Sequence, residues 1–420
     1  MSWIGLDDTD TLSGGCTTYE FHLLIRELTE LSNNGKPWAI PTDSRLVRLW
    51  PFASKRTRGN AALATKIEIK KEDEHELHLF LEDWFNKLLV KISKLKVIQS
   101  QHSNREQTTP EPCLIYSRKQ YPDYYWKAVR TNVDYEYASS LIRNESNSKI
   151  WGEEGKREGL IGALAAISWV GLDDQTWELT AYRNENNYSS KREVSSESVK
   201  QMTEKYTHTI LNRDPNSDRS LIAPNTPCPV LYGIRSECPE EVKNAHIFLQ
   251  SNSENENCSS FQLWRTNQAT GDHIEHQYVS KLKSNPKINK GGHALIEVDT
   301  ISPKNDVAIL MAFEESGPLN KLANKLKKDD VVGWQGLKSP SGEFHLERLK
   351  LIRGTPRDRK RPKCSCGGKL KSSGRNQPLR CEECNLKFPR LWEGKKEIPQ
   401  SWVEPNPSER RHLAKPLNRN

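Results

Sequence analysis

The start of the chain pairs a short apolar run with a longer helical stripe. Trp3, Ile4 and Leu6 are too few for a helix, so they predict a short buried strand. From residue 17 onward apolar residues recur every three or four positions, which predicts an amphipathic helix that ends at Asn34-Gly35. The apolar stripe of this helix comprises Phe21, Leu24, Ile25, Leu28 and Leu31. The chain therefore opens as strand, turn and helix.

Strand and helix patterns continue to residue 183. Two apolar runs, Val47–Trp50 and one that ends at Ile69, predict strands. Residues 100–112 are polar and contain proline, which is typical of a loop and a domain seam. Helices are predicted at 74–95, 121–142 and 160–167, the last with small residues suited to close packing, and a further strand is predicted at 177–183. Because strands alternate with helices here, we predict an α/β domain at the amino-terminal end of the chain.

From residue 258 the pattern changes to strands. Five are predicted, with one short helix between the third and the fourth; the strands are 261–266, 293–301, 307–313, 331–337 and 344–352, and the helix is 319–326. This order is that of the OB-fold, a barrel that often binds oligonucleotides, although such a barrel can also act only as a spacer. Residues 393–420 contain several prolines and little periodicity, so we expect them to be disordered until RNA binds.

Charge is unevenly spread along the chain. The 420 residues carry a net charge of +8, but residues 353–420 hold eighteen Lys+Arg against seven Asp+Glu, a net of +11 that leaves −3 for the rest. A basic end on a near-neutral body predicts a polyanionic partner, or else a solubilising tail. The longest apolar run, 160–172, is too short to span a bilayer, and no signal-peptide pattern precedes the first strand. We therefore expect a soluble, cytoplasmic protein with no membrane partner.

An acidic cluster follows the first strand. Asp7, Asp8 and Asp10 lie within four residues, and packed carboxylates are costly unless a cation compensates them. Mg²⁺ prefers a few carboxylates together with phosphate oxygens. Gly14 and Gly15 allow a sharp turn close to a ligand, and Thr17 or Thr18 can cap the helix, whose amino terminus then faces a phosphate; these features favour a nucleotide site over an inert Asp-rich turn.

These residues carry a family resemblance. GLDDTDTLSGGCTTY, residues 5–19, resembles the opening of the archaeal tRNA-isoleucine 2-agmatinylcytidine synthetase family, which usually has Met at the position of Gly15. The resemblance implies an enzyme that uses ATP to attach agmatine to the wobble cytidine of a minor isoleucine tRNA. It also implies phosphorylation of a threonine in the CTTY motif, at Thr17 or Thr18.

A basic loop follows the second predicted strand. Residues 55–60, KRTRGN, place three cations before a Gly-Asn turn, which suits a phosphate cradle as well as a solvated loop. They resemble the KTRGN motif of the same family, with Arg56 at the usual lysine position. We therefore expect ATP to contact the acidic cluster and this loop; the nucleotide-binding candidates are Gly14, Gly15, Lys55, Arg56, Arg58, Gly59 and Asn60.

Further motifs of the family lie in the middle of the chain. Residues 206–214 resemble its HTF.NYD motif, and they suggest His208 and Asp214 as agmatine-binding residues, because a guanidinium needs carboxylate or carbonyl acceptors. The alternative is that the histidine is structural. Residues 265–268 resemble part of the family's KTNQGT motif and end the first strand of the predicted barrel. We expect Arg265, Thr266, Asn267 and Gln268 to bind RNA there.

Four of the nine cysteines form a metal-like cluster. Cys364-x-Cys366 and Cys381-x-x-Cys384 bracket a short glycine-containing ribbon, and four thiolates suit a structural tetrahedral Zn²⁺ site that leaves no position for a catalytic water. The other five cysteines are scattered along the chain, which argues for a reducing compartment. Lys369, Lys371 and Arg380 surround the cluster, so we expect this ribbon to grip RNA phosphates.

Together these patterns predict a multidomain α+β protein. Its expected parts are an α/β kinase-like ATP/Mg²⁺ catalytic domain at 1–120, a ferredoxin-like α+β domain at 121–245, an OB-fold β-barrel at 246–355, a zinc ribbon at 356–392 and a basic tail at 393–420. The resemblance implies a tRNA-modifying ligase that phosphorylates the C2 oxygen of cytosine, with ATP cleaved to AMP and phosphates. Asp7, Asp8 and Asp10 would hold Mg²⁺, and Arg56 and Arg58 would neutralise the transferring group. The alternative is a non-enzymatic OB-fold and zinc-ribbon nucleic-acid-binding protein; the sequence leaves the oligomeric state open.

Overall fold

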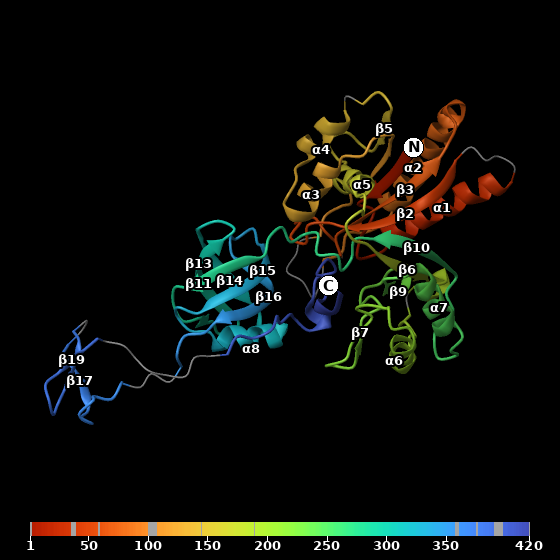
Figure 1. Ribbon diagram of the computed structural model, residues 1–420. Coiled ribbons are helices and arrows are strands. Elements are labelled where there is room, and N and C mark those ends of the chain that lie inside the picture. The colour runs from red at the N-terminus through yellow and green to blue at the C-terminus, as the bar shows by residue number, and fades with distance from the viewer. Residues whose placement is uncertain are drawn as a thin grey trace. The chain divides into compact units, whose positions relative to one another are not determined.

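The protein divides into two compact units (Figure 1). The first comprises Met1–Glu275 and Asn406–Asn420, and the second comprises His276–Pro405. The computed structural model describes residues 2–34, 39–57, 59–99, 107–143, 145–188, 190–357, 361–374, 377–389 and 398–419. Among these residues, no helix has both the length and the apolar character needed to cross a membrane.

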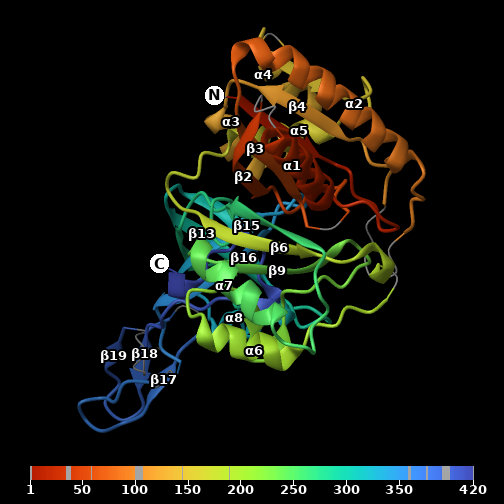
Figure 2. The same cartoon turned by 90° about the vertical axis from the view of Figure 1, so that its right-hand side faces the viewer.

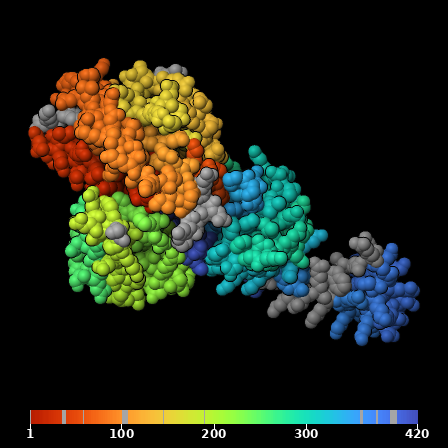
Figure 3. All heavy atoms as spheres, turned by 180° about the vertical axis from the view of Figure 1, so that it is seen from behind, coloured from red at the N-terminus to blue at the C-terminus, as the bar shows by residue number. Residues whose placement is uncertain are grey.

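One eight-stranded sheet organises the first unit. Its order is β5-β4-β1-β3-β2-β10-β6-β9, and every neighbouring pair is antiparallel except β2 and β10. The strands are β1 (Ser2–Asp7), β2 (Ile40–Arg48), β3 (Ala61–Glu68), β4 (Cys113–Ser117), β5 (Ser148–Trp151), β6 (Thr176–Tyr182), β9 (Val230–Ser236) and β10 (Ser260–Thr266). The pairing of β2 with β10 joins two lobes of this unit, which Figure 3 shows as a red-to-yellow lobe and a yellow-green lobe.

Helices cover both faces of the sheet in the amino-terminal lobe. Ile4 of β1 packs with Phe21 in the core beneath α1 (Thr17–Asn33) and α2 (Glu74–Ser93). The alternate residue Trp3 packs with Leu164 in the core beneath α3 (Pro122–Arg130), α4 (Tyr135–Ile142) and α5 (Gly159–Ser168). β1 is thus apolar on both faces, because helices bury both. The predicted first strand and the helices at 17–34 and 74–95 are confirmed.

The aromatic stretch predicted as one helix at 121–142 is two helices. The α3 helix ends at Arg130, and Asp134 starts α4 by accepting a hydrogen bond from the backbone N–H of Tyr137 at 2.8 Å. Both helices pack with α5 on the amino-terminal half of the sheet. The predicted boundary at residue 120 therefore lies just after β4, inside this lobe.

The carboxy-terminal lobe of the first unit has one covered sheet face. The α7 helix (Pro239–Gln250) packs on β6 and β9, and α6 (Ser196–Lys205) packs on α7 (Figure 2). A two-stranded hairpin, β7 (Arg213–Asp214) and β8 (Arg219–Ser220), lies between α6 and β9 in the sequence. The buried residues of this lobe form their own core.

The second unit contains a closed barrel. β11 (Tyr278–Leu282) pairs with both β13 (Ala294–Ser302) and β15 (Val331–Lys338), so the order β11-β13-β14-β16-β15 closes on itself. The remaining elements are β14 (Asp306–Ala312), β16 (Phe344–Arg353), α8 (Pro318–Lys325) and a short strand, β12 (Lys287–Ile288), that pairs with β13.

The barrel begins later in the chain than the sequence predicts. Residues 261–266 form a strand, but it is β10 of the first unit, because Trp264 packs into the core beneath α1 and the strand pairs with β2 and β6. Assigning this strand to the barrel was wrong. The true first strand, β11, follows the mostly polar residues 271–277 and has only five residues.

The end of the chain is ordered where the structure describes it, contrary to the predicted disorder of 393–420; residues 390–397 lie outside the described residues. Val403 pairs with Leu349 of the barrel through two backbone hydrogen bonds of 2.9 and 3.0 Å. Residues 406–419, which we call the carboxy-terminal segment, belong to the first unit, and Leu413 is buried in the core that contains α5. The ordered conformation of this segment could not be predicted, because backbone hydrogen bonds and isolated apolar side chains hold it in place and neither leaves a periodic pattern in the sequence.

Candidate active site

A cavity of about 360 Å³ lies between the acidic loop after β1 and the basic loop after β2. We call it the first cavity. The structure brings most of the predicted nucleotide-site residues to its wall, namely Asp7, Asp8, Asp10, Thr17, Lys55, Arg56, Gly59 and Asn60. Thr18, Gly14 and Gly15 are not among its lining residues, and Arg58 lies outside the described residues. Gly15 instead makes the turn, since its φ of 73° and a close approach to the Thr9 carbonyl leave no room for a side chain.

The helix α5 fits closely around Asp7. A Cβ atom on Gly162 would lie 1.8 Å from the Asp7 carboxylate, and one on Gly159 would lie 2.6 Å from the Asp7 carbonyl oxygen. The two glycines of α5 are therefore required for the acidic loop to reach its position. Burial, and then the charge of Asp8, raises the pKa of Asp7 well above its usual value.

Asp8 occupies a left-handed backbone conformation with a φ of 61°. Its carboxylate accepts a hydrogen bond of 2.8 Å from the backbone N–H of Glu111. Burial nevertheless dominates and, together with the charge of Asp10, raises the pKa of Asp8 to about 7. Carboxylates crowded in this way are those that a bound cation holds in their ionised form.

Asp10 caps helix α1 from the loop. Its Oδ1 accepts hydrogen bonds from the Thr17 backbone N–H at 2.6 Å and from the Thr17 hydroxyl at 3.0 Å. The hydroxyl of Thr9 donates in turn to Thr17 Oγ1 at 3.1 Å. The residue at the N-cap position is Cys16, which makes no side-chain capping bond, so the predicted cap by Thr17 or Thr18 is wrong. A carboxylate at this position suits the positive end of the helix dipole.

Hydrogen bonds and ion pairs tie the basic loop to its acidic surroundings. The Thr57 hydroxyl donates to the Asp10 carbonyl at 3.1 Å, and the Lys55 ammonium lies 2.8 Å from Glu158 and 3.5 Å from Glu111. The hydrogen bond with Glu158 raises the pKa of Lys55. The wall of the first cavity thus contains both carboxylates and cations, a combination that can hold a polyphosphate together with a divalent ion.

A second cavity of about 350 Å³ adjoins the first within the same unit. Asp10, Thr17 and Gly59 line both cavities. The sequence did not point to four further titratable residues of this second cavity, which are Arg48, Glu178, Arg235 and His412. The signal was a charged residue directly after an apolar residue of a strand, as at Arg48, Glu178 and Arg235, whereas nothing in the sequence marked His412.

The residues predicted to bind RNA on the barrel have another location. Thr266, Asn267 and Gln268 are fully buried in the first unit. The Arg265 guanidinium pairs with Asp43 at 2.6 Å, and the Gln268 amide hydrogen-bonds to Glu178. Their predicted position on the barrel is wrong because β10 belongs to the large sheet, and buried side chains have no surface to present to an RNA.

Neither residue predicted to bind agmatine lines the two cavities. His208 is 70% exposed and lies 3.2 Å from Glu241. The Asp214 carboxylate is buried and accepts hydrogen bonds from the backbone N–H groups of Asn216 at 3.0 Å and Ser408 at 3.3 Å. Asp214 thus fixes the carboxy-terminal segment, and the agmatine-binding role of both residues stays a prediction.

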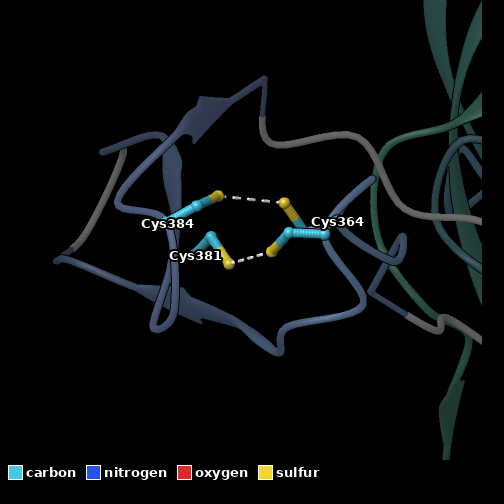
Figure 4. A group of neighbouring side chains, drawn as sticks. Cys364, Cys381 and Cys384 are labelled. Atoms are coloured by element: carbon cyan, nitrogen blue, oxygen red, sulfur yellow. Dashed lines mark hydrogen bonds between the residues drawn. The ribbon is translucent and has the colours of Figure 1, made fainter.

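The predicted cysteine cluster is assembled in the second unit. The sulfur atoms of Cys364, Cys366, Cys381 and Cys384 lie within 4.8 Å of one another. Figure 4 shows the sulfurs of Cys364 and Cys384 facing each other, 3.4 Å apart. Four sulfurs at this spacing can hold a zinc ion tetrahedrally. They lie on a three-stranded ribbon of β17 (Leu370–Ser372), β18 (Leu379–Cys381) and β19 (Lys387–Phe388).

The ribbon presents cations at its surface. Lys369, Lys371 and Arg380 are all exposed. Lys371 and Arg380 are direct cross-strand neighbours on β17 and β18, and Lys371 also pairs with Glu382. Like charges directly opposite each other are unfavourable in a bare sheet, so this pair favours an anionic partner.

Comparisons with known proteins support a single family. The family model of the TiaS TCKD domain matches residues 3–151, and the model of the TiaS FLD domain matches residues 157–273. The tRNA-isoleucine-2 2-agmatinylcytidine synthetases TiaS of Pyrococcus horikoshii and Archaeoglobus fulgidus are each 32% identical over 99% of this chain, which covers 96% and 97% of their lengths.

Two solved structures are similar over the whole chain. A complex of TiaS with its isoleucine tRNA and ATP is 29% identical with a TM-score of 0.78, and a complex of TiaS with the same tRNA, AMPCPP and agmatine is 27% identical with a TM-score of 0.77. Each comparison covers 100% of this chain and 97% of the other chain. The likeness therefore extends through both units.

Proposed function

The chain belongs to the TiaS family of tRNA-isoleucine-2 2-agmatinylcytidine synthetases, and we propose that its two adjoining cavities divide the reaction of that family between them. The reaction conjugates agmatine to C2 of the wobble cytidine of the minor isoleucine tRNA, while ATP is cleaved to AMP and phosphates. The observation that carries the proposal is that Asp10 and Thr17 line both cavities. A phosphoryl group can then pass from a nucleotide on one side to a tRNA base on the other.

The first cavity is the proposed ATP site. Asp7, Asp8 and Asp10 offer only oxygen ligands, which suits Mg²⁺, and when bound the ion would neutralise charge on the triphosphate. Lys55 and Arg56 also line this cavity, and the backbone at Gly59 and Asn60 can approach phosphates closely. The family motif extends the same role to Arg58. Gly14 and Gly15 support the site by shaping the turn.

Thr17 is the proposed phosphorylated threonine of the CTTY motif. Its hydroxyl already donates to Asp10, so the carboxylate is placed to take the proton as the oxygen attacks a phosphorus atom. Thr18 lines only the second cavity, and its hydroxyl contacts the Cys16 sulfur at 3.0 Å. The two threonines of the motif are thereby distinguished by their hydrogen bonds.

The second cavity is the proposed place of conjugation. A wobble cytidine that leaves the anticodon stack can enter it, as enzymes that act on a base commonly require. Asp10 and Glu178 are the carboxylates that this cavity offers to the cationic amine. His208 and Asp214 remain predicted agmatine contacts. Neither residue lines the second cavity, so an agmatine molecule bound there would have to extend beyond its wall to reach them.

The second unit is proposed to deliver the RNA. Its closed strand order, with a helix between the third and fourth barrel strands, supports the predicted OB-fold. We assign the lobes of the first unit to the predicted kinase-like and ferredoxin-like folds. Zn²⁺ held by the four cysteines would stabilise the ribbon whose cations contact tRNA phosphates. All nine cysteines are free, which suits a reducing compartment such as the cytoplasm.

The experiment that tests the proposal uses a minor isoleucine tRNA transcript. The transcript is incubated with the protein, ATP and agmatine, and its anticodon fragment is analysed by mass spectrometry. We expect a mass increase at the wobble cytidine that is absent when agmatine is withheld. An unchanged fragment would favour the alternative, a nucleic-acid-binding protein without catalytic activity. A cluster of three carboxylates has no evident use in such a protein.

A further inference from the structure

Two arginines from different lobes meet at the second cavity. Arg48 ends β2, Arg235 lies in β9, and their exposed fractions are only 14% and 8%. Each is held by an asparagine that bonds its backbone on both sides. Asn267 accepts from Arg48 N–H at 2.7 Å and donates to the Arg48 carbonyl at 2.9 Å, and Asn212 makes the equivalent bonds to Arg235, both at 2.9 Å.

These guanidinium groups have more donors than the protein satisfies. Among the described residues, the buried Nε atoms of Arg48 and Arg235 have no hydrogen-bond partner. Glu178 lies 4.0 Å from Arg48, at the limit of an ion pair, and already accepts from Gln268 and Thr180. Burial lowers the pKa of Arg48; the charge of Glu178 partly offsets this effect, and the charge of Arg235 adds to it. Buried donors without partners are costly unless a ligand completes them.

The carboxy-terminal segment adds a third donor. The His412 carbonyl accepts from Ala269 N–H at 2.7 Å, and the next carbonyl, of Leu413, accepts from Gly271 N–H at 2.8 Å. The segment thereby places the imidazole in the cavity wall. The nearby charge of Arg48, followed by burial, lowers the pKa of His412 well below its usual value, so the ring is neutral and can donate one N–H.

Gly59 makes this arrangement sterically feasible. A Cβ atom at this position would lie 2.6 Å from the Arg48 guanidinium and 3.5 Å from the His412 ring. Gly59 also belongs to the basic loop of the first cavity. Arg48 and His412 therefore lie next to a residue proposed to hold ATP.

We propose that Arg48, Arg235 and His412 form a phosphate-binding subsite in the second cavity, distinct from the triphosphate site of the first cavity. Two buried guanidinium groups and a neutral imidazole fit a phosphate monoester, which accepts several charge-assisted hydrogen bonds. This inference rests on the proposed function. In that reaction the monoester is carried either by Thr17 or by the C2 oxygen of the wobble cytidine.

The second source gives the subsite a chemical purpose. As the agmatine nitrogen bonds to C2, the C2–O bond breaks and its electron pair leaves on the phosphate oxygen. The amine loses one proton to solvent, and the product is inorganic phosphate. Guanidinium groups that hold this phosphate stabilise the charge that develops on the leaving group.

Arg235→Gln tests the subsite in the full-length protein, with Arg219→Gln on the exposed β8 strand as a control for loss of one positive charge. The reaction contains tRNA, agmatine and ATP, and inorganic phosphate is added as the probe. We expect Arg235→Gln to conjugate about tenfold fewer tRNAs per ATP cleaved and to need about tenfold more phosphate for half inhibition. The Arg219 variant should behave as the wild type. Equal conjugation yield and equal phosphate inhibition in both variants would overturn the subsite.

Labelling distinguishes the two sources of the monoester. ATP carrying ³²P in its β- and γ-phosphates is supplied with tRNA but without agmatine, and label is counted on protein and on tRNA. Less label on the protein in Arg235→Gln places the Thr17 monoester in the subsite. Undiminished protein label followed by slower displacement of tRNA label when agmatine is added places the cytidine monoester there. Label and displacement both equal to the wild type reject the subsite.

A second variant guards against misfolding of the first. His412→Asn keeps the backbone bonds of the carboxy-terminal segment and should raise the phosphate needed for half inhibition severalfold. An unaltered value in a folded His412→Asn protein would remove this residue from the subsite. If the wild type itself forms no conjugated tRNA, the proposed function fails; a conjugating wild type with unaffected variants disproves the subsite alone.

Discussion

The hydroxyl of Thr17 donates a hydrogen bond of 3.0 Å to the carboxylate of Asp10, at the point where two cavities of the first unit adjoin. The same carboxylate oxygen accepts the Thr17 backbone N–H at 2.6 Å, so the pair also fixes the start of helix α1. The proposed nucleophile, its proposed base and a helix terminus thus share one location. This pair connects the proposed nucleotide site with the proposed tRNA site.

Replacing Thr17 should separate the two threonines of the motif. We expect Thr17→Ala to lower ATP-dependent conjugation about a hundredfold, because it removes the hydroxyl that Asp10 is proposed to activate. Thr18→Ala is the matched control and should retain most activity, since its hydroxyl contacts the Cys16 sulfur instead of a carboxylate. Conjugated tRNA is measured by mass spectrometry, and phosphothreonine by peptide mapping. Phosphate found on residue 18 of the wild type would contradict the assignment.

Removing a carboxylate from the acidic loop should abolish ATP cleavage without loss of tRNA binding. Asp8→Ala takes away one of the proposed Mg²⁺ ligands, and we expect AMP formation to fall at least about a hundredfold. The control is Asp83→Ala, which loses an exposed carboxylate paired with Lys87 on α2. AMP release is followed by chromatography and tRNA affinity by filter binding. Normal AMP release by Asp8→Ala would remove the proposed metal site.

The close fit of helix α5 makes Gly162 a sensitive position. A Cβ atom there would meet the Asp7 carboxylate at 1.8 Å, so Gly162→Ala must displace that side chain. We expect AMP formation to fall about tenfold or more, because small displacements of reacting groups are costly. Gly291→Ala, an exposed glycine of the second unit, is the control. Wild-type AMP formation by Gly162→Ala would show that the Asp7 position is unimportant.

An ion-pair cluster fastens the carboxy-terminal segment to the first unit. The Arg419 guanidinium binds Asp174 at 2.7 Å and Glu237 at 2.9 Å, and Lys415 lies 3.0 Å from Asp174. We expect Arg419→Ala to lower the free energy of unfolding by about 1–3 kcal/mol and to expose the segment to proteolysis. Urea titration and limited proteolysis measure these effects. The exposed pair of Lys149 with Glu82 offers the control Lys149→Ala, which should change stability little.

The same cluster predicts a pH dependence. Burial raises the pKa of Asp174, but hydrogen bonds from Arg419 and Lys415 outweigh it, so the pKa is lowered overall. A carboxyl with a depressed folded-state pKa contributes stability that is present above its ordinary value of about 4 and is lost as the pH falls further. Thermal unfolding between pH 7 and pH 3 should therefore show a smaller acid-induced loss in Asp174→Asn than in the wild type. Parallel curves for the two proteins would exclude this contribution.

Loss of the cysteine cluster should affect tRNA binding before ATP chemistry. Replacing Cys381 and Cys384 by Ser removes two of the proposed zinc ligands and should unfold the small ribbon that displays Lys371 and Arg380. We expect weaker tRNA affinity, zinc content close to zero by atomic absorption, and basal ATP hydrolysis like that of the wild type. A variant of Cys258, which lies outside the cluster, is the control. Full tRNA affinity in the double variant would contradict a ribbon that grips RNA.

Local patterns predicted the parts of the site that are close in the sequence. The run from Trp3 to Leu6, the acidic cluster and the stripe of α1 follow from periodicity and from the chemistry of carboxylates and glycines. The basic loop at 55–60 was recognisable for the same reason. Its contact with the acidic loop depends on the pairing of β1 and β2 with β3. The sequence does not specify this pairing, but the pairing is consistent with the predicted α/β domain.

Long-range relations were not predictable from these patterns. Strand β10 looks like any other short strand, and only its pairing with β2 assigns it to the large sheet instead of the barrel. Arg48, Arg235 and His412 come from three distant segments, so their meeting at one cavity depends on the complete fold. The carboxy-terminal segment is fixed by backbone bonds and ion pairs, which leave no hydrophobic period in the sequence.

The most direct test of the account is a crystal structure with a non-hydrolysable ATP analogue and Mg²⁺. The account predicts a triphosphate in the first cavity, with the ion against Asp7, Asp8 and Asp10 and the phosphates against residues 55–60. The phosphate nearest the second cavity should approach Thr17. A nucleotide bound elsewhere in a crystal whose first cavity is accessible would contradict the central claim.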